Sequence, residues 1–314
     1  MKPFAFVFPG QGSHSICMLD GFATNRAVQE TVAEASDVLG VDIGMLMRTG
    51  PKDQLDLTTN TQPVMLTAAV ATYRAWRAAG GVTPTVVAGH SLGEYSALVA
   101  SGVLSFRDAL PLVRFRAEAM QQAVPVGRGG MAAILGLSDA DVIASCAAAA
   151  QGEVVEAVNF NAPLQVVIAG TKAAVERACE IAKAKGAKRA LVLAVSAPFH
   201  SSMLQPASDR LRDYLAKVVF ATATIPVINN VDVAVVSDPA AFCDALVRQA
   251  ASPVRWVETI QKIAASGCLQ VIECGPGKVL AGLTKRIDPQ LTTEAITDEV
   301  SLQRVLAFLN ESNS

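Results

Sequence analysis

Residues 85–94 read Thr-Val-Val-Ala-Gly-His-Ser-Leu-Gly-Glu, a short apolar run that leads into a Gly-x-Ser-x-Gly sequence. The run predicts a buried strand, with Ser91 at the start of the helix that follows. Such a strand–turn–helix can be a nucleophile elbow, in which small flanking residues let the backbone bend sharply and expose the serine hydroxyl. It can also be an ordinary glycine turn. The two interpretations differ in whether the chain also supplies a base, an oxyanion site and a pocket.

Outside this stretch, segments of strand and helix alternate along the chain, which predicts an α/β fold with a mostly parallel sheet. The expected strands are residues 4–8, 85–88, 225–228 and 269–272. The expected helices are residues 23–39, 64–79, 105–122, 239–250, 255–266 and 278–287. Pro63 is expected in the first turn of the second helix, where proline is favoured.

The middle of the chain has a different order of elements. Strand, helix, two strands joined by a short loop, helix and strand follow one another between residues 131 and 195, which is the ferredoxin-like pattern. We therefore expect a larger, hydrolase-like α/β domain formed by residues 1–127 and 196–314, into which a ferredoxin-like subdomain of residues 128–195 is inserted. A cleft between two such bodies is a common place for an active site.

Composition excludes several classes of function. The 314 residues are 51% hydrophobic and 17% charged, with a net charge of −2, so no basic surface for nucleic acid is expected. No stretch reaches the roughly 20 apolar residues that span a bilayer, and the apolar run near the amino terminus is too short for a signal peptide. We expect a cytoplasmic protein without membrane contact, and a monomer because no heptad seam is present.

Cysteine and histidine spacing argues against a metal site. The six cysteines are scattered without a Cys-x-x-Cys pair, as expected of reduced thiols in a cytoplasmic protein. The three histidines, His14, His90 and His200, lie far apart in sequence and lack metal-ligand spacing.

A serine nucleophile needs a base, and histidine is the usual one near neutral pH. His90 is adjacent to Ser91, so its side chain is expected to point away from the serine. His14 lies in a polar loop and is expected to be exposed. His200 remains by elimination. An ordinary α/β-hydrolase would carry its histidine late in the chain, and none follows residue 200, so a lipase or esterase fits poorly.

Four stretches in a fixed order, supported by three shorter ones, resemble the malonyl-CoA:acyl carrier protein transacylases of type II fatty-acid synthesis. The four are Phe8-Pro9-Gly10-Gln11-Gly12-Ser13, Gly89-His90-Ser91-Leu92-Gly93-Glu94, Ala197-Pro198-Phe199-His200-Ser201 and Gln249-Ala250-Ala251-Ser252-Pro253-Val254-Arg255-Trp256. The shorter ones are residues 60–63, 159–163 and 273–277. Together the matches extend from residue 4 to about residue 285.

The resemblance implies a ping-pong acyl transfer with no bound cofactor. Ser91 would take the malonyl group from the coenzyme A thioester with His200 as base, and holo-acyl carrier protein would then receive it. A backbone carbonyl near Gln249 would orient His200. The backbone N–H groups of Gln11 and Leu92 would form the oxyanion hole.

Substrate selection is expected from a few side chains of the same family pattern. Arg116 lies at the margin of the apolar face of its helix, so its position alone favours a side chain that snorkels to solvent. The resemblance instead implies that Arg116 pairs with the malonyl carboxylate, beside Met120 and Gln11. Phe199 would disfavour a branched methylmalonyl group by its bulk.

The chain departs from the family pattern at His14 and Cys17, where the family usually has glutamine and glycine. These changes leave the conformation of that loop open, and Cys17 could be a reactive thiol near the site. Three alternatives also stay open: an acyltransferase of a polyketide or malonate decarboxylase system, a serine thioesterase, and a non-catalytic module that docks carrier protein.

Overall fold

Strand β1 (Phe4–Phe8) explains why the main sheet is covered on both faces. Successive side chains of a strand point to opposite faces. Here the three phenylalanines belong to one buried cluster, while Ala5 and Val7 belong to another. Two apolar faces require helices on both sides, the arrangement of a mostly parallel sheet. The computed structural model describes residues 2–311.

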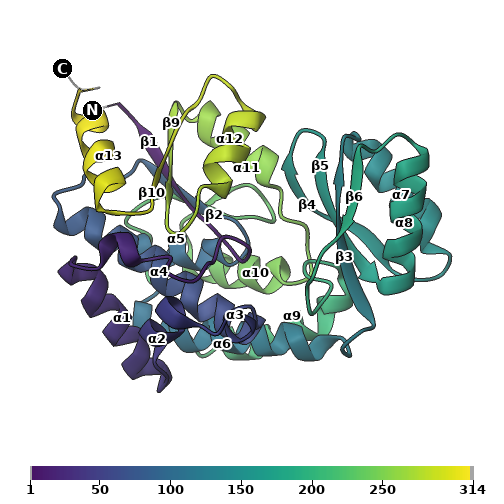
Figure 1. The fold of residues 1–314 in the computed structure, drawn as a ribbon, viewed down its shortest axis with the longest axis horizontal. Helices are drawn as coiled ribbons and strands as arrows, with labels where there is room; N and C mark the ends of the chain where they lie inside the picture. The colour runs from purple at the N-terminus through teal and green to yellow at the C-terminus, as the bar shows by residue number, and fades with distance from the viewer. Residues whose placement is uncertain (1, 312–314) are drawn as a thin grey trace.

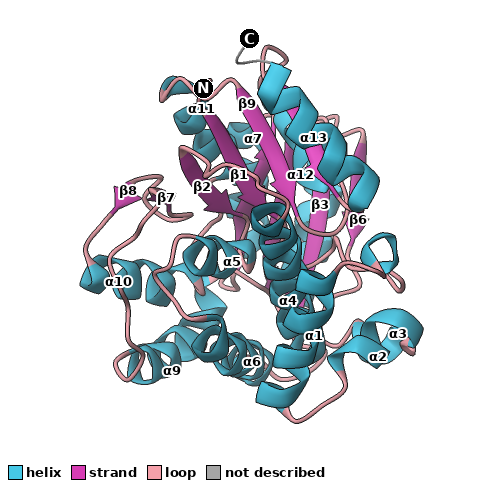
Figure 2. Ribbon diagram, turned by 90° about the vertical axis from the view of Figure 1, so that its left-hand side faces the viewer, coloured by secondary structure: helices cyan, strands magenta, loops and turns pink. Residues whose placement is uncertain are grey.

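The main sheet has the strand order β10-β9-β1-β2-β7-β8, and all its neighbours are parallel except the antiparallel pair β7–β8. Its other strands are β2 (Val86–Gly89), β7 (Val227–Ile228), β8 (Val235–Val236), β9 (Gln270–Cys274) and β10 (Thr292–Ile296). Helices α11 and α12 cover the face of Ala5 and Val7. The opposite face is covered by α4, α5 and α13, and α1 and α6 pack on α4 below them in Figure 2.

The helices of this larger part are α1 (Arg26–Leu39), α2 (Ile43–Thr49), α3 (Lys52–Leu55), α4 (Thr58–Ala78), α5 (Gly93–Ala100), α6 (Phe106–Ala123), α9 (Gln205–Leu215), α10 (Pro239–Gln249), α11 (Trp256–Ala265), α12 (Val279–Ile287) and α13 (Glu299–Glu311), with short 3-10 turns η1 (Asp20–Phe22) and η2 (Ser202–Leu204). Among residues 2–311, no helix has the length and apolar character needed to cross a bilayer.

A second, antiparallel sheet has the order β4-β5-β3-β6, and it lies beside the larger part in Figure 1. Its elements are β3 (Gly129–Leu135), α7 (Asp139–Ala150), β4 (Val155–Ala162), β5 (Gln165–Thr171), α8 (Lys172–Ala184) and β6 (Arg189–Val192). Helices α7 and α8 pack on one face. The other face carries Met131 and Val167, against which Phe199 of the larger part packs.

The expected fold class is confirmed: a mostly parallel α/β sheet accompanies a ferredoxin-like unit with the order β-α-β-β-α-β. The proposed boundaries at residues 128 and 195 stay predictions. The two parts also touch through backbone, because Val254 donates to the carbonyl of Val158 at 2.8 Å and accepts from Phe160 at 3.0 Å.

Some element boundaries differ from expectation. Helix α4 begins at Thr58, so Pro63 lies inside the helix rather than in its first turn. Strand β6 ends at Val192, although the N–H of Leu193 still donates to the carbonyl of Met131 in β3 at 2.9 Å. Residues 193–195 line the cavity described below. The sequence analysis did not identify β10 or α13. Strand β10 is a partly exposed edge strand that contains Thr and Glu, so it lacks a continuous apolar run.

Candidate active site

The turn between β2 and α5 has the geometry of a nucleophile elbow. Ser91 adopts a positive φ of 52°, a conformation that residues other than glycine rarely take. A Cβ on Gly89 would lie 1.9 Å from the carbonyl carbon of Gly93, and one on Gly93 would lie 2.0 Å from the carbonyl oxygen of Phe8. Both positions therefore require glycine, because the end of β2, the start of α5 and the end of β1 are in backbone contact and leave no space for a side chain.

His200 is the histidine that reaches the serine. Its Nε2 lies 2.7 Å from Ser91 Oγ, and its Nδ1–H donates to the carbonyl oxygen of Gln249 at 2.9 Å. That bond leaves Nε2 free to accept the serine proton. Burial, and then the charge of Arg116, lower the pKa of His200 to about 3, so the imidazole is neutral at pH 7.

The other two histidines have different partners. His90 Nε2 bonds Asn161 Oδ1 at 2.8 Å and its ring lies against Trp256, so it points away from Ser91 as expected. His14 is not freely exposed: its side chain is 12% accessible, and its Nε2 lies 3.1 Å from Asp56 Oδ1.

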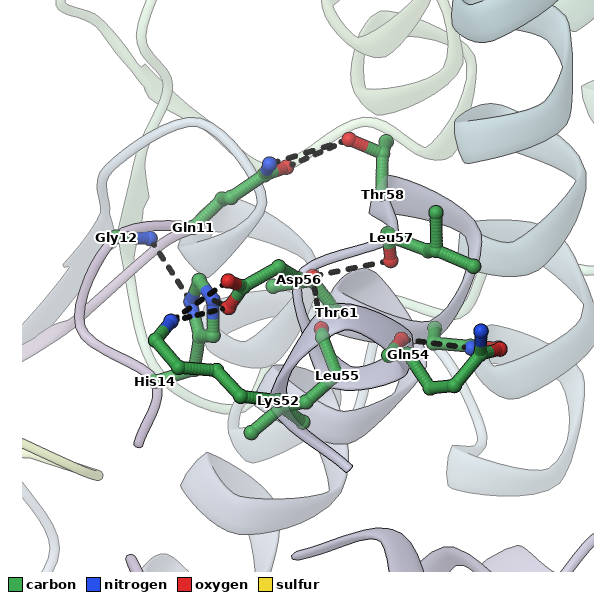
Figure 3. A network of polar contacts seen from close by, with 11 residues as sticks. Gln11, Gly12, His14, Lys52, Gln54, Leu55, Asp56, Leu57, Thr58 and Thr61 are labelled. Carbon is green, nitrogen blue, oxygen red and sulfur yellow. Dashed lines mark hydrogen bonds and ion pairs between the residues drawn. The ribbon is translucent and has the colours of Figure 1, made fainter. Parts of the chain in front are cut away.

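Figure 3 shows the contacts that surround His14. Its Nδ1 accepts the backbone N–H of Gly12 at 3.3 Å, and Lys52 Nζ binds the same Asp56 carboxylate. The lysine bond is the main reason that the pKa of Asp56 is lowered. His14 thus connects the glycine-rich loop after β1 to α3 and the residue that follows it. The loop is therefore held at this position of family departure by contacts of the His14 ring.

Cys17 lies away from the reacting groups. It is exposed, does not line the cavity, and its Sγ donates to the carbonyl of Arg48 at 3.4 Å. A hydrogen bond with Asp20 raises the pKa of its thiol, which lowers its reactivity. The open possibility of a reactive thiol near the site is therefore not supported. Within the described chain, no cluster of three His, Cys, Asp or Glu side chains could hold a metal.

The loop that follows β1 lies directly against the elbow. A Cβ on Gly10 would be 2.5 Å from the carbonyl oxygen of His90, so only glycine permits this approach. Among residues 2–311, neither the N–H of Gln11 nor that of Leu92 donates to a protein acceptor. The Gln11 side chain donates to Thr58 Oγ1 at 3.1 Å. Two unpartnered backbone donors thus belong to loops that meet beside Ser91.

Arg116 is buried at 2% exposure, so it does not snorkel to solvent. Its guanidinium donates to Gln62 Oε1 at 2.8 Å, to Gln249 Oε1 at 2.9 Å and to Ser91 Oγ at 3.2 Å. Its Nε has no partner. Within residues 2–311 no carboxylate forms an ion pair with Arg116, so its hydrogen bonds go only to neutral oxygens, with the ring of Tyr95 at 5.3 Å. The carboxylate of Glu94 acts on the guanidinium without direct contact.

A cavity of about 500 Å³ contains these groups. Its lining includes Gln11, Ser91, Arg116, Phe199 and His200, together with Met131 and Val167 from the small sheet. Met120 is fully buried and does not line the cavity; its Sδ lies 4.0 Å from Gln62 Nε2.

Three polar residues of the site escaped the sequence analysis as functional candidates. Gln62 lies in the 60–63 stretch that supported the family resemblance, but it was given no role there. Asn230 gave no signal in the sequence, although its Oδ1 accepts the N–H of Ser91 at 2.7 Å. Glu94 stands in the quoted serine stretch, and its carboxylate is buried next to Gln249 and Asn230. Burial raises the pKa of Glu94 to about 7.

Comparison with known proteins now assigns the family. The acyl transferase domain family matches residues 5–299. The chain belongs to this family. The malonyl CoA-acyl carrier protein transacylase of Salmonella typhimurium is 53% identical over 307 residues, which cover 98% of this chain and 99% of the relative.

Solved structures of this acyl transferase family agree over the same length. An acyl-carrier-protein S-malonyltransferase from Burkholderia pseudomallei is 69% identical with a TM-score of 0.96, and the match covers 97% of this chain and 99% of that one. A malonyl-transacylase in complex with a type II PKS acyl-carrier protein is 50% identical with a TM-score of 0.96, over 98% and 99% of the two chains.

Proposed function

We propose that this chain transfers a malonyl group from malonyl-CoA to the phosphopantetheine thiol of acyl carrier protein, through a malonyl ester of Ser91. The observation that carries the proposal is the arrangement around one hydroxyl. A neutral imidazole lies 2.7 Å from Ser91 Oγ, and a buried guanidinium without a carboxylate partner lies 3.2 Å from the same atom. The malonyl transacylase names of the full-length relatives support the same reaction.

In the first half-reaction, Ser91 Oγ attacks the thioester carbonyl while His200 Nε2 takes the serine proton. The N–H groups of Gln11 and Leu92 donate to the oxyanion of the tetrahedral intermediate. The carbon–sulfur bond then breaks, and the coenzyme A sulfur leaves with the proton held by His200. The Gln249 carbonyl keeps the imidazole in the tautomer that this transfer requires.

In the second half-reaction, the same groups work in reverse. The phosphopantetheine thiol gives its proton to His200, and its sulfur attacks the ester carbonyl. The bond from the carbonyl carbon to Ser91 Oγ breaks, and the serine oxygen recovers the proton. No bound cofactor takes part, and both substrates are thioester or thiol forms of the same phosphopantetheine arm.

Arg116 selects the acyl group by binding its free carboxylate. When the malonyl carboxylate forms a bidentate pair with the Arg116 guanidinium, this pair replaces hydrogen bonds to neutral oxygens. It also compensates the positive charge of Arg116, which is costly to bury. Because the Arg116 charge is the second cause of the low His200 pKa, pairing with malonyl also makes His200 a stronger base. Phe199 lines the cavity and narrows it beside the acyl group. Met120 does not line the cavity but contacts Gln62, so Met120 acts on the substrate only through Gln62.

The test follows radiolabel from malonyl-CoA. Wild-type protein is expected to become labelled and to pass the label to holo-acyl carrier protein, whereas the Ser91→Ala variant should do neither. Label that persists on the Ser91→Ala protein would contradict the assignment of the nucleophile. Free malonate as the main product would indicate a thioesterase, and no turnover would indicate a docking module. Faster transfer to carriers of polyketide or malonate decarboxylase systems would assign the chain to those pathways instead of fatty-acid synthesis.

We also propose that the protein acts in the cytoplasm as a monomer. The six cysteines are all free, as a reducing compartment favours. Each half-reaction uses only residues of one chain. Sedimentation equilibrium in the micromolar range tests this proposal, and a dimer mass there would contradict it.

A further inference from the structure

Glu94 lies behind the reacting side chains, and the transfer mechanism proposed above gives it no role. Its carboxylate is 2% exposed, and its Oε2 accepts hydrogen bonds from Gln249 Nε2 at 2.8 Å and from the backbone N–H of Asn230 at 3.1 Å. Neither donor is a reacting group. Each of them, however, holds reacting groups in place.

Gln249 joins three parts of the site. Its backbone carbonyl accepts the Nδ1–H of His200 at 2.9 Å, its Oε1 accepts from Arg116 at 2.9 Å, and its Nε2 donates to the carbonyl of Ser91 at 2.9 Å. A carboxylate accepts hydrogen bonds and cannot donate them. Glu94 therefore selects the amide nitrogen, and the amide oxygen of Gln249 has to face Arg116.

Asn230 performs the corresponding role for the elbow. Its Oδ1 accepts the N–H of Ser91 at 2.7 Å, and its Nδ2 donates to the carbonyl of Gly89 at 2.7 Å. These bonds span the strained turn on both sides of His90. Because Glu94 binds the backbone of Asn230, the same carboxylate fixes the residue that supports the nucleophile.

We propose that Glu94, as an ionised carboxylate, is a positioning residue of the transfer reaction. It fixes Gln249 and Asn230, and through them the imidazole of His200, the guanidinium of Arg116 and the turn of Ser91. In a serine–histidine–acid triad the acid touches the histidine directly. Here the acid acts through one intervening residue, Gln249. The inference rests on the malonyl transfer proposed above.

The negative charge of Glu94 contributes to positioning in addition to the hydrogen bonds that its oxygens accept. Hydrogen bonds to an ionised group are about twice as strong as neutral ones. Proton transfer from Ser91 also creates an imidazolium near Arg116, so the site then holds two cations. The charged or titratable groups that face Glu94 are Arg116 of α6, Asp232 of the loop after β7, and Tyr95 of its own helix. Arg116 favours the ionised form, and Asp232 opposes it.

The pH dependence of kcat/KM for malonyl-CoA tests the proposal, because it reports groups of the free enzyme. Burial raises the pKa of Glu94 to about 7, whereas that of His200 is lowered to about 3. Wild-type activity should therefore fall on the acid side with a midpoint near pH 7. In the Glu94→Gln variant, which cannot titrate, this acid limb should disappear, and the rate at pH 8 should fall by about 10- to 100-fold through kcat.

Glu273→Gln is the matched control. Glu273 is also buried, with a pKa raised to about 7, but its Oε2 binds the N–H of Ala281 at the start of α12 rather than the site. This variant should keep the acid limb of the wild type. An unchanged limb in Glu94→Gln would overturn the proposal, while absence of transfer in the wild type would instead refute the proposed function.

If the Glu94→Gln protein does not fold, the Glu273→Gln protein answers the same question. Its infrared difference spectrum between pH 5 and pH 9 should contain the band of a buried protonated carboxyl group, which reports Glu94. Loss of that band is expected to follow the rise of kcat/KM with the same midpoint. A band that titrates more than about one pH unit away from the activity would overturn the proposal.

Discussion

At the scale of single residues, Arg116 shows how burial decides the role of a side chain. Its position on α6 is compatible with an arginine that reaches solvent, but the guanidinium is enclosed and bonds Gln62, Gln249 and Ser91. A buried guanidinium whose hydrogen bonds all go to neutral oxygens can still bind an anion directly. The malonyl carboxylate is the anion that the proposed reaction brings to this cavity.

Replacement of Arg116 by alanine should therefore change substrate preference. Loss of one partner of a buried charge pair costs roughly 2–5 kcal/mol, which corresponds to a loss of malonyl kcat/KM of tens to thousands of fold. Acetyl-CoA has no distal carboxylate, so its kcat/KM should stay level or rise. Arg116→Lys should recover little of the malonyl activity, since an ammonium cannot form the bidentate pair. Equal loss for both acyl groups would mean that Arg116 only supports α6.

At the scale of elements, the elbow between β2 and α5 depends on close backbone contacts rather than on side chains. Gly93 lies against the backbone at the end of β1, and Gly89 lies against the backbone of Gly93. This contact brings the loop after β1, with Gln11, to the start of α5, with Leu92. The two backbone donors proposed for the oxyanion hole therefore depend on a glycine in each limb.

Gly93→Ala should destabilise the protein strongly. Its Cβ would lie 2.0 Å from the carbonyl oxygen of Phe8, and neither backbone can move without displacing the sheet. We expect a loss of unfolding free energy of about 3 kcal/mol or more, measured by urea denaturation. Gly282→Ala is the control, because Gly282 is a helical glycine in α12 with no atom within 4 Å of the added Cβ. That variant should gain about 0.5–1 kcal/mol; equal behaviour of the two variants would contradict the close contact.

At the scale of the whole molecule, two buried glutamates tie stability to pH. The folded-state pKa values of Glu94 and Glu273 are both raised to about 7, chiefly by burial. The folded protein therefore binds these protons more tightly than the unfolded chain between about pH 4.5 and pH 7. Stability falls as the pH rises through that window, and the cost is complete above the folded pKa.

The Glu273→Gln variant isolates one of these contributions. Since glutamine does not titrate, the difference in unfolding free energy between the variant and the wild type should change in favour of the variant from pH 4.5 to pH 8. A shift from 4.5 to about 7 corresponds to a change of about 3 kcal/mol. Urea denaturation at several pH values measures it. A difference that is independent of pH would show that Glu273 keeps an ordinary pKa in the folded protein.

The sequence alone determined the fold class and several local structures, because these depend on short-range patterns. Alternating segments predicted the parallel sheet, and the helix expected over residues 105–122 is α6, where Ser105 Oγ accepts the N–H of Asp108 at 3.0 Å. Counting histidines was enough to pair His200 with Ser91. By contrast, the start of α4 was misplaced, since Pro63 also fits the interior of a helix when neighbouring packing stabilises it.

Only the tertiary structure decided the surroundings of the reacting groups. Glu94, Asn230 and Gln249 come from α5, the loop after β7 and the end of α10, and no sequence period relates them. Their meeting depends on how helices pack around the sheet, as does the burial that removes Arg116 from solvent and lowers the pKa of His200. Hydrogen-bond partners and pKa values depend on distance and desolvation in three dimensions, and a linear pattern of residues contains neither.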